Sequence, residues 1–258
     1  MGIKITKMQG CGNDFVILDY DEFLKMNISM PDVAKKLCDR HFGVGADGLI
    51  IPNTNVEDAD ISWYFYNSDG STAQMCGNGM RCFAKYVYDK RLVQKEEFSV
   101  KTLAGIISPK IMPDGLVRVN MSKPILIPEK IPFIPNSNMN YKTAVKNMIF
   151  EGCAVSMGNP HCIIYTDNID SVPLHEVGPY IENASIFPER VNVSFVQTLD
   201  LSHIRMRVWE RGTGETLACG TGACAALVAG VINNRTDRRA DVWLKGGHLI
   251  IRWDEDKN

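Results

Sequence analysis

The distribution of apolar and polar residues predicts strands in both halves of the chain, each followed by a turn. Residues 61–66 read Ile-Ser-Trp-Tyr-Phe-Tyr, a segment rich in the aromatic side chains that favour strands. Residues 203–208 alternate His, Arg and Arg with Ile, Met and Val, as expected of a half-buried strand. Turn-forming residues follow at 67–71 and at 210–215.

A helix is predicted after each of these turns. From Met80 to Val87, apolar residues recur with the i, i+3, i+4, i+7 spacing that places them on one helix face. Residues 223–232 are apolar on all sides, as expected of a helix buried inside a curved sheet. The alternation around Ile3 and Ile5 also predicts a first strand near the N-terminus.

The two halves carry matching motifs. Residues 76–82 read Cys-Gly-Asn-Gly-Met-Arg-Cys, and residues 219–224 read Cys-Gly-Thr-Gly-Ala-Cys. Other landmarks recur at nearly the same offset: Asn67 with Glu210, Gly12-Asn13 with Gly158-Asn159, and Gly48 with Asn192. We interpret this as an internal duplication that gives two similar domains of ordinary size.

The domain boundary is predicted at a proline-rich segment that contains Pro124, Pro128, Pro132 and Pro135. We expect an N-terminal domain at residues 1–122 and a C-terminal domain at residues 123–246. The final strand, 249–253 within residues 247–258, is compatible with either domain.

Composition narrows the class of protein. The chain has 258 residues, of which 45% are hydrophobic and 22% charged, and its net charge is −2, so a globular protein is expected. It has no basic stripe to favour nucleic acid and no apolar run near the ~18 residues that span a bilayer. The eight cysteines form no CxxC pair and no zinc-like spacing, which predicts reduced thiols, no metal and a cytoplasmic location.

Chemistry is predicted at the first cysteine of each motif. Cys76 and Cys219 would each lie at or just before the N-terminus of a helix, where unpaired N–H groups and the helix dipole stabilise a thiolate. The same N–H groups can hold a carboxylate. If both thiols face one substrate, one can remove a proton from an α-carbon while the other delivers a proton to the opposite face. No phosphate-binding or dinucleotide-binding motif is present, so no cofactor is expected.

The chain resembles the diaminopimelate epimerase family, which belongs to the superfamily of cofactor-independent, two-cysteine amino-acid racemases and epimerases. The resemblance runs from about residue 8 to residue 230. It rests on segments at 10–15, 45–48, 67–70, 76–79, 157–161, 190–192, 210–215 and 218–222. It implies an α+β fold of two pseudosymmetric domains, each a barrel-like, mostly antiparallel sheet wrapped around a central helix. It also implies a homodimer that interconverts LL- and meso-diaminopimelate, on the way to lysine and peptidoglycan.

The family's functional residues carry over by position. Cys76 and Cys219 match the two catalytic cysteines, and His161 matches a histidine that could assist deprotonation of the first. The residues that match the substrate-binding set are Asn13, Asn67, Gly77, Asn78, Asn159, Asn192, Glu210, Arg211, Gly220 and Thr221. Some members place glutamine where this chain has Gly48, so one polar contact is absent here. Asp47 and Asp69 are expected to hold turns.

Two alternatives stay open on the sequence. A racemase of another amino acid, such as histidine, would keep both cysteines but alter the distal-recognition residues; Arg211 and Glu210 argue against it. A thiol redox protein would use Cys76 and Cys219 as a disulfide switch, but it would not need the two predicted carboxylate-binding turns.

Overall fold

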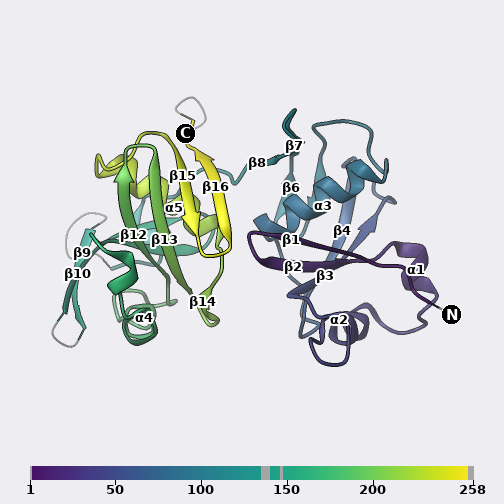
Figure 1. The fold of residues 1–258 in the computed structure, drawn as a ribbon, viewed down its shortest axis with the longest axis horizontal. Coiled ribbons are helices and arrows are strands. Elements are labelled where there is room, and N and C mark those ends of the chain that lie inside the picture. The colour runs from purple at the N-terminus through teal and green to yellow at the C-terminus, as the bar shows by residue number, and fades with distance from the viewer. Residues whose placement is uncertain (1, 135–139, 146–147, 255–258) are drawn as a thin grey trace. The chain divides into compact units, whose positions relative to one another are not determined.

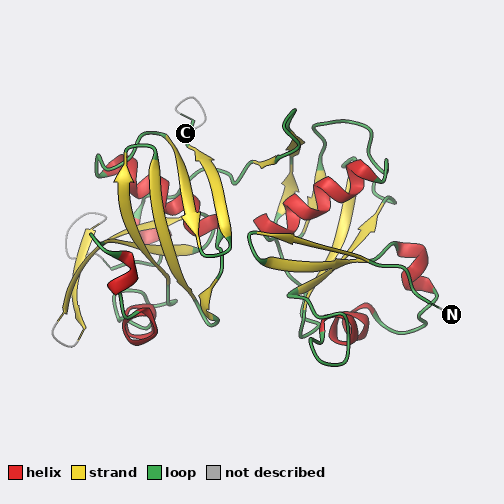
Figure 2. Ribbon diagram, viewed as in Figure 1, coloured by secondary structure: helices red, strands yellow, loops and turns green. Residues whose placement is uncertain are grey.

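The computed structural model describes residues 2–134, 140–145 and 148–254 of the chain. The chain divides into two compact units, Met1–Asn120 and Met121–Asn258. In each unit a curved sheet wraps around one long helix, and shorter helices cover the sheet's other face (Figure 1; Figure 2). This is the predicted α+β class, with one sheet-wrapped helix in each half.

The first unit is built around helix α3. Its main sheet has the strand order β1-β2-β3-β4-β5-β6, and β7 and β8 form a separate hairpin. Its elements are β1 (Thr6–Gly10), β2 (Asn13–Ile17), α1 (Tyr20–Leu24), α2 (Met30–Cys38), β3 (Gly48–Asn53), β4 (Ile61–Asn67), α3 (Gly77–Asp89), β5 (Val100–Thr102), β6 (Gly105–Ile107), β7 (Pro109–Ile111) and β8 (Val117–Val119).

The second unit is built around helix α5. Its sheet has the order β16-β15-β13-β12-β11-β10-β9, and β14 pairs with β13. Its elements are the 3₁₀ helix η1 (Pro128–Lys130), β9 (Asn140–Val145), β10 (Met148–Ser156), β11 (Pro160–Tyr165), the 3₁₀ helix η2 (Ile169–Ser171), α4 (Leu174–Glu182), β12 (Asn192–Asp200), β13 (His203–Glu210), β14 (Gly214–Thr216), α5 (Gly220–Ile232), β15 (Arg239–Leu244) and β16 (Gly247–Arg252).

The two sheets repeat one topology. Along β1 to β6 the pairings run antiparallel, parallel, antiparallel, parallel, antiparallel. The same sequence of pairings runs along β10, β11, β12, β13, β15 and β16. The central helices α3 and α5 have 13 residues each, and the outer helices α2 and α4 have 9 each. The duplication inferred from motif spacing is therefore a duplication of structure.

Each sheet has a hydrophobic core on both of its faces. In the first unit, α3 contacts β1, β2, β3, β7 and β8, and its predicted apolar face, from Met80 to Val87, is buried. Phe83 on this face is completely buried between β4 and the helix, with its ring 5.2 Å from that of Trp63. In the second unit α5 is buried along most of its length. Burial on all sides explains why its sequence shows no amphipathic pattern.

Some predicted details differ in the structure. The first strand predicted near the N-terminus is present, but β1 begins at Thr6 and leaves out Ile3 and Ile5. Their side chains are partly buried against the core beneath α2. The segment with the prolines packs on the second unit, where Ile131 is fully buried, and Pro135 lies outside the described residues. The last strand, β16, pairs with β15 in the second unit's sheet.

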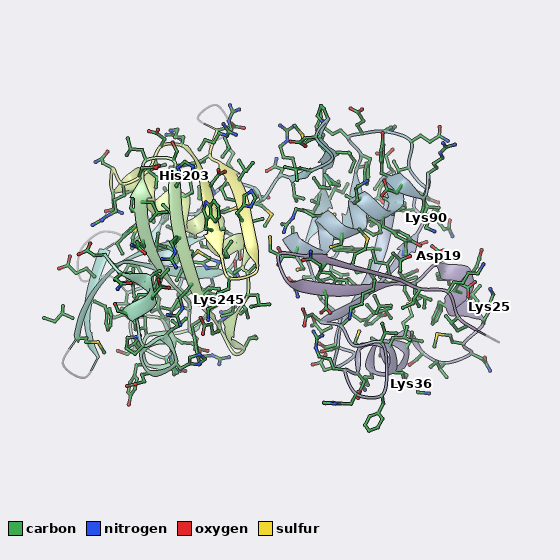
Figure 3. The ribbon with its side chains drawn as sticks, in the orientation of Figure 1. Asp19, Lys25, Lys36, Lys90, His203 and Lys245 are labelled. Carbon is green, nitrogen blue, oxygen red and sulfur yellow. The ribbon has the colours of Figure 1, made fainter. Side chains whose placement is uncertain are left out.

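A half-buried carboxylate ties together the sheet around β14. Glu215 accepts from Arg207 Nε at 2.9 Å, from Lys245 Nζ at 2.7 Å and from His175 Nε2 at 2.8 Å. Lys245, labelled in Figure 3, follows β15. Arg207 lies on β13 and His175 on α4, so the contacts tie β14 to all three of these elements. Burial opposes ionisation of Glu215, but the hydrogen bonds from Arg207 and Lys245 outweigh it and lower its pKa to about 2.

We expect Glu215→Gln to destabilise the fold by about 3 kcal/mol at pH 7. The stability that comes from a depressed carboxyl pKa is complete above the unfolded value near 4.5 and is lost as pH falls through about 2. Urea unfolding should therefore show the difference from wild type shrinking by more than half at pH 3. Asp58→Asn, which removes an exposed ion pair with Lys101, is the matched control and should cost under about 1 kcal/mol. An equal Glu215→Gln effect at both pH values would contradict the assignment.

Candidate active site

The two repeated cysteines cap the two central helices in the same way. Cys76 has an extended backbone (φ −142°, ψ 121°) and its Sγ accepts from the Gly79 N–H at 3.4 Å. Cys219 (φ −132°, ψ 110°) accepts from the Gly222 N–H at 3.3 Å. Glycine leaves room for the sulfur at this third position of α5, because a Cβ on Gly222 would lie 3.2 Å from Cys219 Sγ and one of the two would have to shift. The predicted position of both cysteines at helix N-termini is confirmed.

These helix ends are suited to negative charge. The first N–H groups of a helix have no intrahelical partners, and the helix dipole adds about half a positive charge. A thiolate at the N-cap is stabilised by that field, and a carboxylate can bind to the same N–H groups. The N–H groups of the Gly77-Asn78 and Gly220-Thr221 segments belong to these first turns. The site in each unit can therefore hold a thiolate, a carboxylate or both.

In the first unit the structure brings three predicted residues together. Asn13, at the start of β2, has its Oδ1 3.5 Å from Cys76 Sγ, and the thiol donates to it. Asn78 Nδ2 donates to the same oxygen at 3.4 Å. The Nδ2 of Asn13 donates to Asp47 Oδ2 at 2.6 Å. Asp47, predicted only to hold a turn, thus contacts the cysteine's neighbour directly.

Arg81 supports the first-unit site and was missed in the sequence. Its Nη2 donates to Asn78 Oδ1 at 2.7 Å and lies 3.7 Å from Cys11 Sγ, while its Nη1 donates to the Gly77 carbonyl at 3.3 Å. Asn78 is buried, so its side chain is fixed from both ends. The signal was present in the sequence, because Arg81 lies three residues after Asn78 in the predicted helix, and side chains at that spacing are neighbours.

Asn67 lies in the turn that follows β4. Its Nδ2 donates to Ser71 Oγ at 2.9 Å, and Asp69 Oδ1 accepts from the Ser71 N–H at 2.8 Å, which confirms that Asp69 holds this turn. Asn67 pairs in register with Gly48. A Cβ on Gly48 would lie 2.8 Å from the Tyr66 carbonyl oxygen, so this chain has no room for a larger residue there without a shift.

In the second unit a carboxylate lies beside the cysteine. Burial raises the pKa of Glu210, and hydrogen bonds from Thr216 and Cys219 act in the opposite direction. Thr216 Oγ1 donates to Glu210 Oε1 at 2.5 Å. The Thr221 hydroxyl lies 3.4 Å from Cys219 Sγ. The predicted residues Glu210, Cys219 and Thr221 therefore form one group.

The turn that carries Arg211 is held by buried side chains. The Arg211 N–H donates to Asn192 Oδ1 at 3.0 Å, and Asn192 Nδ2 donates to the Pro160 carbonyl at 2.9 Å. The Gly212 N–H donates to Glu182 Oε1 at 2.8 Å. The Arg211 guanidinium donates to the Glu189 carbonyl through Nη1 at 2.8 Å. Sequence reasoning missed Glu182, whose partners come together only in the folded unit.

Asn159, just before β11, and His161, on that strand, form the last pair. His161 Nε2 lies 3.1 Å from Asn159 Oδ1, and the ring is fully buried. Burial, followed by the nearby Arg211 charge, lowers the pKa of His161 to about 3, so the ring is neutral at physiological pH. Such a ring is a weak proton acceptor. Its assistance to a thiol stays a prediction, and the contact it makes here is with Asn159.

The family follows from comparison with known proteins. The model of the family described as diaminopimelate epimerase matches residues 5–127 and 153–258. The chain belongs to the diaminopimelate epimerase family. Diaminopimelate epimerase of Pelotomaculum thermopropionicum is 46% identical, with 99% of this chain and 93% of the relative aligned. That of Desulforapulum autotrophicum is 47% identical, with 100% of this chain and 94% of the relative aligned.

Solved structures share the epimerase fold at low sequence identity. A Bacillus anthracis phenazine biosynthesis protein of the PhzF family aligns with a TM-score of 0.66 and 17% identity, covering 99% of this chain and 93% of that one. A hydroxyproline epimerase from Agrobacterium vitis aligns with a TM-score of 0.63 and 12% identity, covering 95% and 82%. Within the described part of this family member, no helix is long and apolar enough to cross a bilayer.

Proposed function

We propose that the protein interconverts LL- and meso-diaminopimelate without a cofactor, using Cys76 and Cys219 as its two acid–base groups. The observation that carries the mechanism is the repeated cysteine N-cap, one on the buried helix of each unit. One thiolate removes the α-proton while the other thiol protonates the opposite face of the carbon. Family membership supports the substrate.

The proposed substrate contacts fall into two sets, one for the reacting amino-acid head group and one for the distal head group. The N–H groups of the first turns of α3 and α5 stabilise the reacting carboxylate and the charge that develops on it, each donor contributing roughly 3–4 kcal/mol. Arg211 takes the distal carboxylate through its remaining N–H donors, and Glu210 with the asparagine carbonyls takes the distal ammonium. A substrate with two amino-acid head groups uses both sets, and diaminopimelate has two.

The proposal extends to the setting in which the enzyme works. We place it in the cytoplasm as a homodimer: the resemblance to the family implies the dimer, and cysteine usage favours the cytoplasm. Charge, hydropathy and cysteine spacing favour no nucleic acid, membrane or metal partner. Light scattering on the purified chain measures the mass directly. A single 28.8 kDa species at working concentration would contradict the dimer.

Deuterium incorporation tests the reaction. The purified protein is incubated with LL-diaminopimelate in D₂O without added cofactor, and the α-proton is followed by NMR. We expect meso product that carries deuterium at the inverted carbon, because the proton delivered comes from a solvent-exchanged thiol. Exchange with another amino acid but not with diaminopimelate would discard the substrate and retain the two-thiol mechanism. No exchange with any amino acid would overturn the proposed reaction.

A further inference from the structure

Two equivalent asparagines of the duplicated fold have hydrogen-bond partners of opposite character. Asn13 is the first residue of β2, and Asn159 directly precedes the equivalent strand β11. Asn13 donates through Nδ2 to Asp47 Oδ2 at 2.6 Å. A carboxylate only accepts, so the edge of the Asn13 amide that faces Asp47 is the NH₂ group. The carbonyl oxygen of Asn13 must then face the other way.

Asn159 is held through its carbonyl oxygen instead of its NH₂ group. Its Oδ1 lies 3.1 Å from His161 Nε2, and within the described residues His161 Nδ1 is buried without a hydrogen-bond partner. A buried N–H without a partner is rarer in proteins than an acceptor without one, which places the ring proton on Nε2. His161 therefore donates to Asn159 Oδ1, and the Asn159 NH₂ group remains as a donor. Both halves of the duplication have the asparagine, but its NH₂ group is held in the first unit and its carbonyl oxygen in the second.

The direction of the Asn13 amide matters because of what its oxygen contacts. Oδ1 lies 3.5 Å from Cys76 Sγ and 3.4 Å from Asn78 Nδ2. We propose that Asp47 is a positioning residue for Cys76: it fixes the Asn13 amide so that a carbonyl oxygen, and not an N–H group, faces the thiol. The role of Cys76 as an acid–base group rests on the proposed function, but the positioning of the Asn13 amide by Asp47 does not.

Asp47 is itself held at both oxygens. Its Oδ2 also accepts from the Asp14 N–H at 3.0 Å, and its Oδ1 accepts from Arg40 Nη2 at 2.7 Å. Arg40 bridges to Asp14 Oδ1 at 2.8 Å, and Lys7 Nζ lies 3.0 Å from Asp14 Oδ2. These ion pairs leave Asp47 little freedom to turn, so the Asn13 amide has one favourable orientation.

The charged and titratable groups around this amide come from several elements. Asp14 and Lys7 lie on β2 and β1, Arg40 precedes β3, and Arg81 contacts Asn78 on α3. A carbonyl oxygen stabilises the S–H form of Cys76, whereas the Gly79 N–H and the helix dipole stabilise the thiolate. Asp47 thus moderates the effect of the helix end and keeps a proton available on Cys76.

The test measures thiol reactivity without substrate. Iodoacetamide alkylation of Cys76 in the full-length chain is followed by peptide mass spectrometry across pH. Asp47→Ala should raise the rate at neutral pH about three- to tenfold, since the released Asn13 can turn an N–H toward the thiolate, and tenfold corresponds to one pH unit in pKa. Asp47→Asn keeps an acceptor oxygen for Asn13 and should stay within about twofold of wild type.

The pair of variants separates positioning from charge. Loss of the Asp47 charge alone would accelerate alkylation equally in the alanine and asparagine variants, and that result would overturn the proposal. In an Asn13→Ala background, adding Asp47→Ala should change the rate little, because no amide remains to turn. Asn13→Ala alone should accelerate alkylation, and an unchanged rate there would also overturn the proposal. Asp58→Ala, on an exposed ion pair of the same unit, is the matched control.

This readout is independent of the proposed reaction. A protein that fails the deuterium test can still show the Asp47-dependent alkylation of Cys76. A protein that epimerises diaminopimelate can equally show no dependence on Asp47. The two failures therefore lead to different conclusions.

Discussion

Cys219→Ala is expected to lower kcat for epimerisation about 10³-fold or more, because general acid–base catalysis by a positioned group typically contributes 10²–10⁴-fold. Cys219 lies at the N-cap of α5, and its Sγ accepts from the Gly222 N–H. Alanine removes the proton-transferring sulfur but keeps the backbone donors of the first turn. Substrate binding should therefore be partly retained. Cys219→Ser should keep a trace of activity, since a hydroxyl is a far weaker acid than a thiol.

The remaining thiol makes this prediction specific to a two-base mechanism. In Cys219→Ala, Cys76 can still remove and return a proton on its own face of the carbon. We expect exchange of solvent deuterium into one epimer without inversion, measured by NMR in D₂O. The matched control is Cys153→Ala, a buried thiol on β10 that should leave kcat nearly unchanged. Full epimerisation by Cys219→Ala would rule out the proposed pair.

Local patterns were sufficient to predict the central helices. The helix face of α3 and the uniformly apolar α5 both follow directly from spacing, and in each helix a Gly-x-Gly segment forms the first turn. The duplication was also visible, because Asn67 and Glu210 keep the offset of the two cysteines. Repetition made a weak motif informative, since two copies at one spacing constrain the fold of both halves.

The outer helices were harder to predict, for different physical reasons. Helix α2 has a capping signal that was overlooked: Ser29 accepts from the Asp32 N–H at 3.3 Å, and a proline follows at the first turn. Helix α4 contains Pro179 after Gly178, and both disfavour helix from sequence. Tertiary contact decides the outcome there, because a Cβ on Gly178 would lie 2.7 Å from the Trp209 ring.

The residues that position the site depend on contacts between segments far apart in sequence. Asp47 lies 34 residues from Asn13, and Glu182 lies 30 residues from Gly212. Nothing in local spacing tells which carboxylate meets which amide. The candidate ligand-binding residues could be predicted by resemblance, but the side chains that fix their orientation required the fold.

Glu182→Gln is expected to destabilise the fold by about 2–4 kcal/mol and to raise KM for diaminopimelate about tenfold or more. Glu182 is buried at the end of α4. Its Oε1 accepts from the Gly212 N–H at 2.8 Å, and its Oε2 accepts from Trp209 Nε1 at 2.7 Å. An amide replaces one of these oxygens with an NH₂ group, so one donor must face another donor. Arg190, 3.4 Å away, also loses its counter-charge.

The Glu182 carboxylate lies in the last turn of α4, so its hydrogen bonds must outweigh an unfavourable interaction with the helix dipole. A negative charge in the last turn of a helix is unfavourable with the helix dipole. The contacts that compensate hold the turn on which Glu210 and Arg211 lie, so their loss should affect substrate binding more than the chemical step. Urea unfolding and steady-state kinetics measure the two effects. Glu176→Gln, exposed in the first turn of the same helix, should cost under about 1 kcal/mol, the range of a helix-dipole contribution. Wild-type stability and KM in Glu182→Gln would show that the turn is held by other contacts.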